Sequence, residues 1–194
     1  MGGFDEGSGF RVQGCARVQG TGFRDGRVIM VSYEVDRKEL ARLARENFDS
    51  LLNCAESTSK AVVDHFNVGR CGFPRAATPF GGGIARGGGP CGAVTGTLMG
   101  IGLLFGREQG GDHHHLDRVY AMVHELQEEF ARRFGSTLCR ELLHCDISTN
   151  SGRIHAKKGK LFDKQCPDYV AGAMDILADI VEKEAGGEYE KKTK

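Results

Sequence analysis

The sequence has no excess charge of either sign, because its 26 basic residues balance 26 acidic ones over 194 positions. A basic excess is typical of proteins that bind nucleic acid or a membrane surface, so the balance argues against both roles. The 29 glycines show no repeating period, which excludes a fibrous chain. No secretory apolar segment stands at the N-terminus, where the first apolar cluster is only Val28–Val31, and we expect a cytoplasmic location.

Alternating patterns typical of strands are absent after residue 36. Apolar residues instead recur at spacings of three and four, which predicts an all-α fold, a bundle of about five helices within residues 36–185. Residues 1–35 are expected to be an arm outside this domain, as a loose segment, a small hairpin or an over-long start, since Met30 is a natural initiator. Residues 186–194 are expected to be a disordered tail.

The first predicted helical segment begins with a capping box at Asp36 and Glu39. It continues to about Phe66, either as one helix or as two with a break near Ser57–Ser59. A glycine-rich loop follows, and the next helix begins at Pro90 and ends near Phe105. Further helices are expected over residues 116–134, in TLCRELLHC after a Ser136 cap, and from Pro167 to about Gly186, with a polar loop over 146–165.

No residue between Gly87 and Gly106 is charged, so this segment has to be weighed as a membrane span. Eight of those twenty residues are glycine, and the helix after Pro90 is too short to cross a bilayer. Gly92, Gly96 and Gly100 lie four apart on one face of this helix. Because each glycine costs about 1 kcal/mol relative to alanine, the stripe predicts close approach of another backbone or a cofactor. We expect this helix to be the buried centre of the bundle.

The sequence contains seven cysteines: Cys15, Cys54, Cys71, Cys91, Cys139, Cys145 and Cys166. A chain with an ample core does not need disulfides, and in a cytosolic protein so many thiols favour metal or redox chemistry. The absence of any C-x-x-C pair argues against an ordinary zinc knuckle. The absence of C-x-x-C-H excludes attached haem.

Three of these thiols, Cys91, Cys139 and Cys166, stand at predicted helix starts. The free N–H groups and positive dipole end there favour thiolate over thiol, which predicts a pKa for Cys91 below the usual value of about 8.5. Cys54, expected on the inner face of the first helix, could converge with them. The alternative is that these cysteines act as small buried hydrophobes.

Other motifs carry weaker signals. GGGIARGGG resembles a phosphate-binding loop, but Arg86 occupies its third glycine position, no strand precedes it and no G-K-[ST] follows, so we expect no nucleotide. The run His113–His115 could bind a metal, although adjacent side chains splay apart, and a solvated helix start capped by Asp112 is the simpler interpretation. No role is assigned to Cys15, Cys71 or Cys145, the last of which we expect to be a spectator.

The segments GGGIARGGGPCGAVTG, FGSTLCRELLHCD and CPDYVAGAMDIL together resemble the C-GCAxxG-C-C family of redox-active proteins over roughly residues 40–182. The resemblance matches the family's cysteines with Cys54 in NCAES, Cys91 in CGAVTG, Cys139 in TLCRELL and Cys166 in QCPDYV. It implies redox chemistry at these residues. A similar domain in split-Soret cytochrome c implies an iron–sulfur centre.

Three hypotheses follow. In the first, Cys54, Cys91, Cys139 and Cys166 hold an iron–sulfur cluster, expected to be [2Fe–2S], that exchanges electrons with an unidentified donor or acceptor protein. In the second, the same residues form a metal-free thiol–disulfide oxidoreductase. In the third, the chain is a non-enzymatic helical interaction module, with the glycine face as a packing surface, for example in a homodimer. No catalytic residue is assigned apart from the cysteines, and whether the protein is an enzyme stays open.

Overall fold

The computed structural model describes residues 22–24, 27–29, 33–70, 72–107 and 110–186. Its elements are β1 (Gly22–Arg24), β2 (Arg27–Ile29), α1 (Arg37–Asp49), α2 (Cys54–Phe66), the 3₁₀ helix η1 (Arg75–Phe80), α3 (Gly92–Phe105), α4 (His113–Phe134), α5 (Cys139–Leu142), α6 (Asn150–Gly159) and α7 (Leu161–Gly186). The all-α class is confirmed for the domain, although the described residues form eight helices rather than about five. Within the N-terminal arm, β1 and β2 pair as an antiparallel hairpin.

The first predicted helical segment is divided at a different place from the one expected. Asp36 caps α1 as predicted, since its side chain accepts from the Glu39 N–H over 3.1 Å. The break lies at residues 50–53 and not near Ser57–Ser59. Asn53 caps α2 with a complete capping box, and Leu51 before it adopts a left-handed φ of 71°. This cap satisfies the first N–H groups of α2 and so allows a new helix to begin there. The spacing of apolar residues continues across the break and therefore does not reveal it.

The C-terminal part also departs from expectation. The predicted polar loop at 146–165 contains α6, capped by the Thr149 side chain, which accepts from the Gly152 N–H over 3.0 Å. α7 begins at Leu161, so Pro167 lies inside the helix instead of opening it. Proline removes one helical hydrogen bond. Leu161 and Phe162 pack against buried residues nearby, and this contact stabilises the turns that precede the proline.

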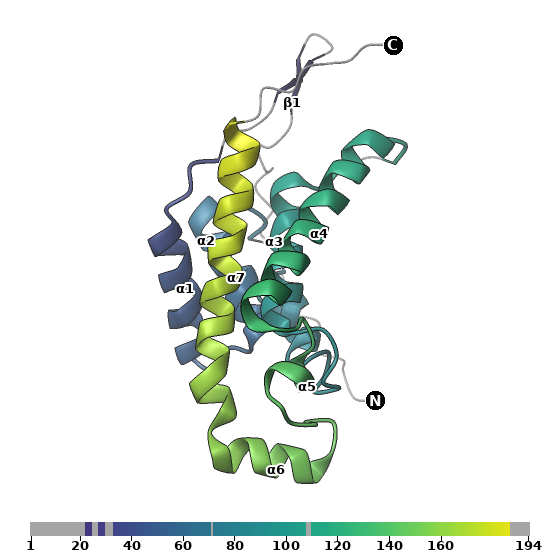
Figure 1. Ribbon diagram of the computed structural model, residues 1–194. Helices are drawn as coiled ribbons and strands as arrows, with labels where there is room; N and C mark the ends of the chain where they lie inside the picture. Colours follow the sequence, from purple (N-terminus) through teal and green to yellow (C-terminus); the bar gives the residue numbers. More distant parts are fainter. Residues whose placement is uncertain (1–21, 25–26, 30–32, 71, 108–109, 187–194) are drawn as a thin grey trace, which may run out of the picture.

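α7 runs the length of the bundle, with α1 and α2 to one side of it and α3 and α4 to the other (Figure 1). The helix predicted as the buried centre, α3, is indeed buried and packs against α2, α4 and α7. The main core fills the space between these helices, with Phe130, Leu40 and Ile101 among its largest fully buried side chains. Among the described residues, no helix combines the length and the hydropathy needed to cross a membrane.

A second, smaller apolar cluster lies at the end of the bundle where α5 and α6 join α7. Three of its buried members are cysteines. The buried members are Cys139, Leu143, Cys145, Ile147, Ala156 and Cys166. Cys91 belongs to the main core, and Cys54 packs against both clusters. The cysteines therefore occupy the boundary between the two apolar clusters.

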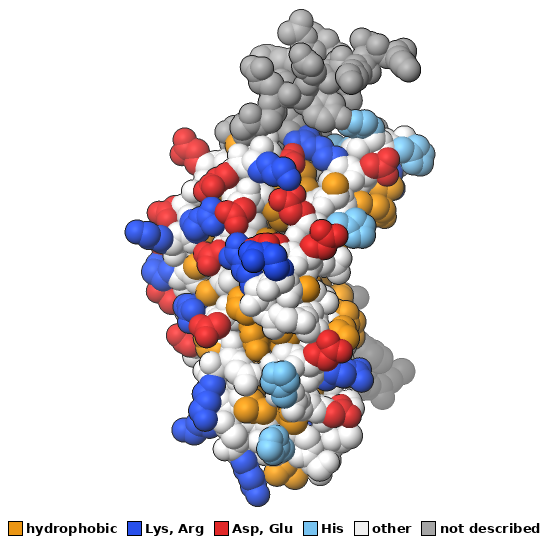
Figure 2. Space-filling view, in the orientation of Figure 1, with side chains coloured by type: hydrophobic (Ala, Val, Ile, Leu, Met, Phe, Trp, Pro, Cys, Tyr) orange, Lys and Arg blue, Asp and Glu red, His pale blue; other side chains and the backbone are white. Residues whose placement is uncertain are grey.

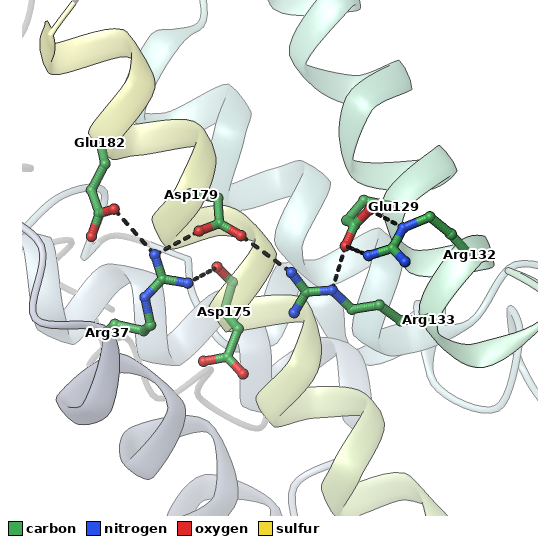
Figure 3. A network of polar contacts seen from close by, with 7 residues as sticks. All are labelled: Arg37, Glu129, Arg132, Arg133, Asp175, Asp179 and Glu182. Atoms are coloured by element: carbon green, nitrogen blue, oxygen red, sulfur yellow. Dashed lines mark hydrogen bonds and ion pairs between the residues drawn. The ribbon is translucent and has the colours of Figure 1, made fainter.

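Charged side chains of both signs are intermingled over the outer surfaces of the long helices (Figure 2). Figure 3 shows a network in which Asp179 of α7 accepts from Arg37 of α1 over 2.6 Å and from Arg133 of α4 over 3.2 Å. Asp175 joins it only through its backbone carbonyl, which accepts from Arg37, while its carboxylate points away. Asp179 thus connects three helices at one point.

Replacing Asp179 by asparagine is expected to lower the free energy of unfolding by about 0.5–1 kcal/mol, since both ion pairs are partly exposed and therefore weak. The loss should shrink at high salt, which screens such pairs. Asp175→Asn, one turn away on the same helix, is the matched control and should change stability little. Urea unfolding of both variants at low and high salt measures this, and equal losses would contradict the bridging role of Asp179.

Candidate functional site

Cys54 is the first residue of α2 and not, as predicted, a residue in the middle of a helix. Asn53 fixes this helix start, because its Oδ1 accepts from the N–H groups of Ala55 and Glu56 over 3.0 and 3.1 Å. Its Nδ2 also donates to the carbonyl of Thr78 at 3.2 Å. The cap therefore fixes the start of α2 and ties it to η1, beside the glycine-rich loop.

Cys91 and Cys139 are brought together by a short antiparallel bridge between Pro90 and Leu138. The Cys91 N–H donates to the carbonyl of Thr137, and the Cys139 N–H donates to the carbonyl of Gly89, each over 2.7 Å. Residues that follow a bridged pair point to the opposite face from it, so both cysteines share one face of the bridge. Cys91 is the N-cap of α3, and Cys139 is the first residue of α5.

Ser136 was predicted to be the N-cap of the helix that contains Cys139, but it is not the N-cap. The N-cap of α5 is Leu138, and the Ser136 hydroxyl accepts from the Leu138 N–H over 2.9 Å. The prediction was wrong by two residues because the bridge extends Leu138 before the helix begins.

The glycine-rich loop packs directly on Cys139. A Cβ at Gly83, which has a φ of +70°, would stand 2.8 Å from the Cys139 Cβ and 2.6 Å from the backbone of Gly89. Residues 82–86 all have left-handed φ values, including Ile84 at 62°. Only glycine fits at position 83, because any side chain would displace either the cysteine or the backbone next to it.

The glycine stripe of α3 faces α2, which confirms the predicted close approach of another backbone. A Cβ at Gly92 would lie 3.0 Å from the Cys54 Cβ, and one at Gly96 would lie 2.3 Å from the carbonyl oxygen of Ala55. The stripe therefore lets the starts of α2 and α3 meet, which brings Cys54 next to Cys91. Because α2 occupies this face within the chain, the face is not free to form a homodimer.

Cys166 was expected at the cap of the last helix, and this expectation was wrong. It is the sixth residue of α7, since that helix begins at Leu161, so no free helix N–H groups surround it. Its thiol nevertheless lies close enough to Cys54 to raise the pKa of that residue. The structure thus brings all four predicted cysteines together, from α2, α3, α5 and α7.

The predicted low pKa of Cys91 is contradicted. Burial raises the pKa of this thiol, and the neighbouring Cys54 and Cys139 raise it further. Hydrogen bonds from the N–H groups of Ala93 and Val94 lower it, as the helix-start argument requires, but they are the smaller effect. Desolvation outweighs the dipole because the thiol is almost wholly buried, with a relative exposure of 3%.

Burial and nearby thiols also raise the pKa of the neighbouring cysteines. The pKa of Cys54 is raised well above its usual value, chiefly by its hydrogen bond with Cys166 and then by burial. Burial, followed by the proximity of Cys54, raises the pKa of Cys139 to about 12. Without a bound cation these groups are therefore neutral thiols at physiological pH.

The free energy of unfolding of the metal-free, reduced protein is expected to fall as the pH rises from about 9 to 12. A raised folded-state pKa gives stability that is complete below the unfolded value and is lost as pH approaches the folded one. Each such thiol contributes a slope of up to about 1.4 kcal/mol per pH unit. Cys139→Ser should show a shallower decline in urea unfolding measured across this range, and an unchanged slope would contradict the shift.

Cys145 is buried in the smaller cluster but has a different partner. Its thiol donates to the carbonyl of Gly152 over 3.3 Å, which ties the segment that follows α5 to α6. Each cysteine within the described residues is free of disulfides. No group of three or more His, Cys, Asp or Glu side chains in that part of the chain is placed to hold a metal ion.

Tyr169 is a residue of this site that sequence analysis missed. Its hydroxyl donates to the carbonyl of Leu142 over 2.9 Å, and its ring packs against both apolar clusters. The signal was its spacing, because residues three apart on a helix share a face and Tyr169 follows Cys166 by three. A second residue missed is Asn53, whose cap sets the position of Cys54.

The remaining candidates are not ligands from the four-cysteine group, or they fall outside the described residues. Asp112 caps α4 as predicted, and the ring Nε2 of His115 contacts the carbonyl oxygen of Phe105 at 2.6 Å. The loop at residues 81–89 follows η1 and is not preceded by a strand. Cys15, Cys71 and the tail at 187–194 fall outside the residues that the structure describes.

Comparison with known proteins identifies a family. The family model described as "Putative redox-active protein (C_GCAxxG_C_C)" matches residues 52–180, a span that includes Cys54, Cys91, Cys139 and Cys166. Neither the curated proteins nor the solved structures contain a significant match to the chain. Similarity to the split-Soret cytochrome domain therefore stays a prediction.

Proposed function

The chain belongs to the C_GCAxxG_C_C family of redox-active proteins, and from this premise we propose that it transfers electrons through an iron–sulfur cluster bound by Cys54, Cys91, Cys139 and Cys166. The observation that carries the proposal is the proximity of these four cysteines, which lie at the starts of α2, α3 and α5 and within α7, at the boundary of the two apolar clusters. Four cysteine thiolates are the usual ligand set of such a cluster.

The donor chemistry of the pocket suits a cationic group. Burial and the neighbouring thiols raise the pKa of Cys54, Cys91 and Cys139 and keep them protonated in the metal-free protein, so each of the three must lose its proton when its sulfur binds iron. The backbone N–H groups of Ala93 and Val94, at the start of α3, lower the pKa of Cys91 and would help to offset negative charge on its sulfur. When bound, the cluster supplies one-electron redox chemistry.

Iron and acid-labile sulfide analysis after anaerobic purification tests this proposal. About two iron and two sulfide per chain, with visible absorption, are expected for a [2Fe–2S] centre. A protein that remains colourless and free of iron after anaerobic reconstitution would contradict it. Within the described residues no group of side chains is already arranged to hold a metal ion, so the reconstitution should be repeated at several iron concentrations.

A second candidate function is thiol–disulfide exchange, and the proximity of the Cys54 and Cys166 thiols favours it. In that reaction the two thiols lose two protons and two electrons to a disulfide of a partner protein, which is reduced to two thiols, and a Cys54–Cys166 disulfide forms. Oxidation of the metal-free protein with a small disulfide, followed by counting of free thiols, measures this reaction. No decrease in thiols would exclude it.

A further inference from the structure

Tyr169 connects the two helices that carry Cys139 and Cys166. It lies one helical turn after Cys166 on α7, and its hydroxyl donates over 2.9 Å to the carbonyl of Leu142. Leu142 is the last residue of α5, which begins at Cys139. A single side-chain hydrogen bond therefore joins the end of one cysteine-bearing helix to the other.

α5 is short enough for this bond to matter. It has four residues, and its start is held by backbone hydrogen bonds from Cys139 to Gly89 and from Arg140 to Gly88. Those bonds fix α5 to the glycine-rich loop, not to α7. At its other end, the hydroxyl of Tyr169 holds the Leu142 carbonyl. A one-turn helix has little stability of its own, so its position depends on such tethers.

The ring of Tyr169 is itself firmly placed. Its centroid lies 5.2 Å from that of Phe134, edge to face, and 6.3 Å from that of Phe130, both on α4. Burial raises the pKa of the Tyr169 hydroxyl, followed by the proximity of Cys166 and Cys91, with Cys139 a smaller contributor. The side chain thus stands between the aromatic core and the thiol pocket.

We propose that Tyr169 is a positioning residue that fixes α5 against α7 and thereby sets the separation of the Cys139 and Cys166 sulfurs. The proposal rests on the proposed iron–sulfur function of these cysteines, because a cluster needs both the Cys139 and the Cys166 sulfur at a set separation. The Cys54–Cys166 exchange reaction does not use Cys139.

Tyr169→Phe tests this role in the metal-free, reduced protein, with the alkylation rate of each cysteine by iodoacetamide followed by mass spectrometry. Loss of a hydrogen bond of ordinary strength should open α5 more often and speed alkylation of Cys139 by about two- to tenfold. Cys91, on α3, should change much less.

Tyr33→Phe is the matched control. The Tyr33 hydroxyl likewise donates to a backbone carbonyl, that of Leu104, over 3.2 Å. Its ring contacts Phe66 and Phe105, at the C-terminal ends of α2 and α3, whereas Cys54 and Cys91 lie at the opposite ends. This variant should lose similar stability without speeding alkylation of Cys139.

Two results would overturn the proposal. One is an unchanged rate at Cys139 in Tyr169→Phe. The other is an equal acceleration of all cysteines, or the same acceleration in Tyr33→Phe, which would indicate a loss of global stability alone. Because this experiment needs no iron, its failure is distinct from failure of the iron–sulfur proposal, which the iron and sulfide analysis decides.

Discussion

Replacing Gly96 by alanine is expected to lower the free energy of unfolding by about 3 kcal/mol or more, which exceeds the effect of an ordinary surface substitution. The new methyl group would lie 2.2 Å from the Thr58 hydroxyl oxygen and 2.3 Å from the carbonyl oxygen of Ala55. The second of these atoms is backbone, so α2 and α3 must move apart. For a domain of this size, thermal unfolding should shift down by roughly 6–12 °C.

Gly102 on the same helix provides the control. An added Cβ there meets nothing within 4 Å, and the position is exposed. Gly102→Ala should therefore be neutral or stabilising by up to about 1 kcal/mol, as expected for alanine in place of glycine within a helix. If Gly96→Ala were as stable as Gly102→Ala, the close contact between α2 and α3 would be wrong.

Gly96→Ala is also expected to disturb the candidate site. The stripe that includes Gly96 also sets Gly92 against Cys54, so separating α2 from α3 moves Cys54 away from Cys91. Gly96→Ala should then bind less iron than Gly102→Ala under identical reconstitution. Equal iron contents would show that the helix spacing does not govern the pocket.

Replacing Cys91 by serine is expected to reduce bound iron to less than about a tenth of the wild-type content, since a cluster needs all four thiolate ligands. The same variant separates the two candidate functions, because a Cys54–Cys166 disulfide requires neither sulfur nor charge from Cys91. A cluster predicts that iron and visible absorption are lost. Thiol–disulfide exchange predicts that the oxidised, metal-free variant still loses two thiols to a disulfide.

Cys145→Ser is the control for this substitution. Cys145 is buried in the same region, but its thiol donates to the carbonyl of Gly152, a bond that a serine hydroxyl can replace. It should keep the wild-type iron content. Equal loss of iron from both variants would indicate general disruption of this end of the bundle and would count against Cys91 as a ligand.

Much of the fold could be predicted from local signals. The cap at Asp36 and the cap at Asp112 stand where the sequence indicates. The glycine stripe of α3 also indicated a close backbone contact, and it makes one. These features depend on residues a few positions apart, whose hydrogen bonds and shared helix faces are set by helix geometry alone.

The helix α6 and the start of α7 could not be predicted from sequence patterns. α6 has few apolar residues and only Ala156 fully buried, so its periodic signal is weak. The start of α7 was misplaced because Pro167 is a common helix opener, whereas contacts of Leu161 and Phe162 extend the helix before it. In both cases tertiary packing overrides a local preference.

The sequence by itself determined that the chain is helical, and it pointed to the four cysteines through the family resemblance later shown by the match to residues 52–180. Only the tertiary structure decided the environment of those thiols. Helix-start N–H groups do lower the pKa of Cys91, as local geometry requires, yet the net effect of its surroundings is to raise it. The reason is that a helix dipole is set by neighbours along the chain, whereas desolvation and the charge of other thiols depend on which distant segments pack around the sulfur.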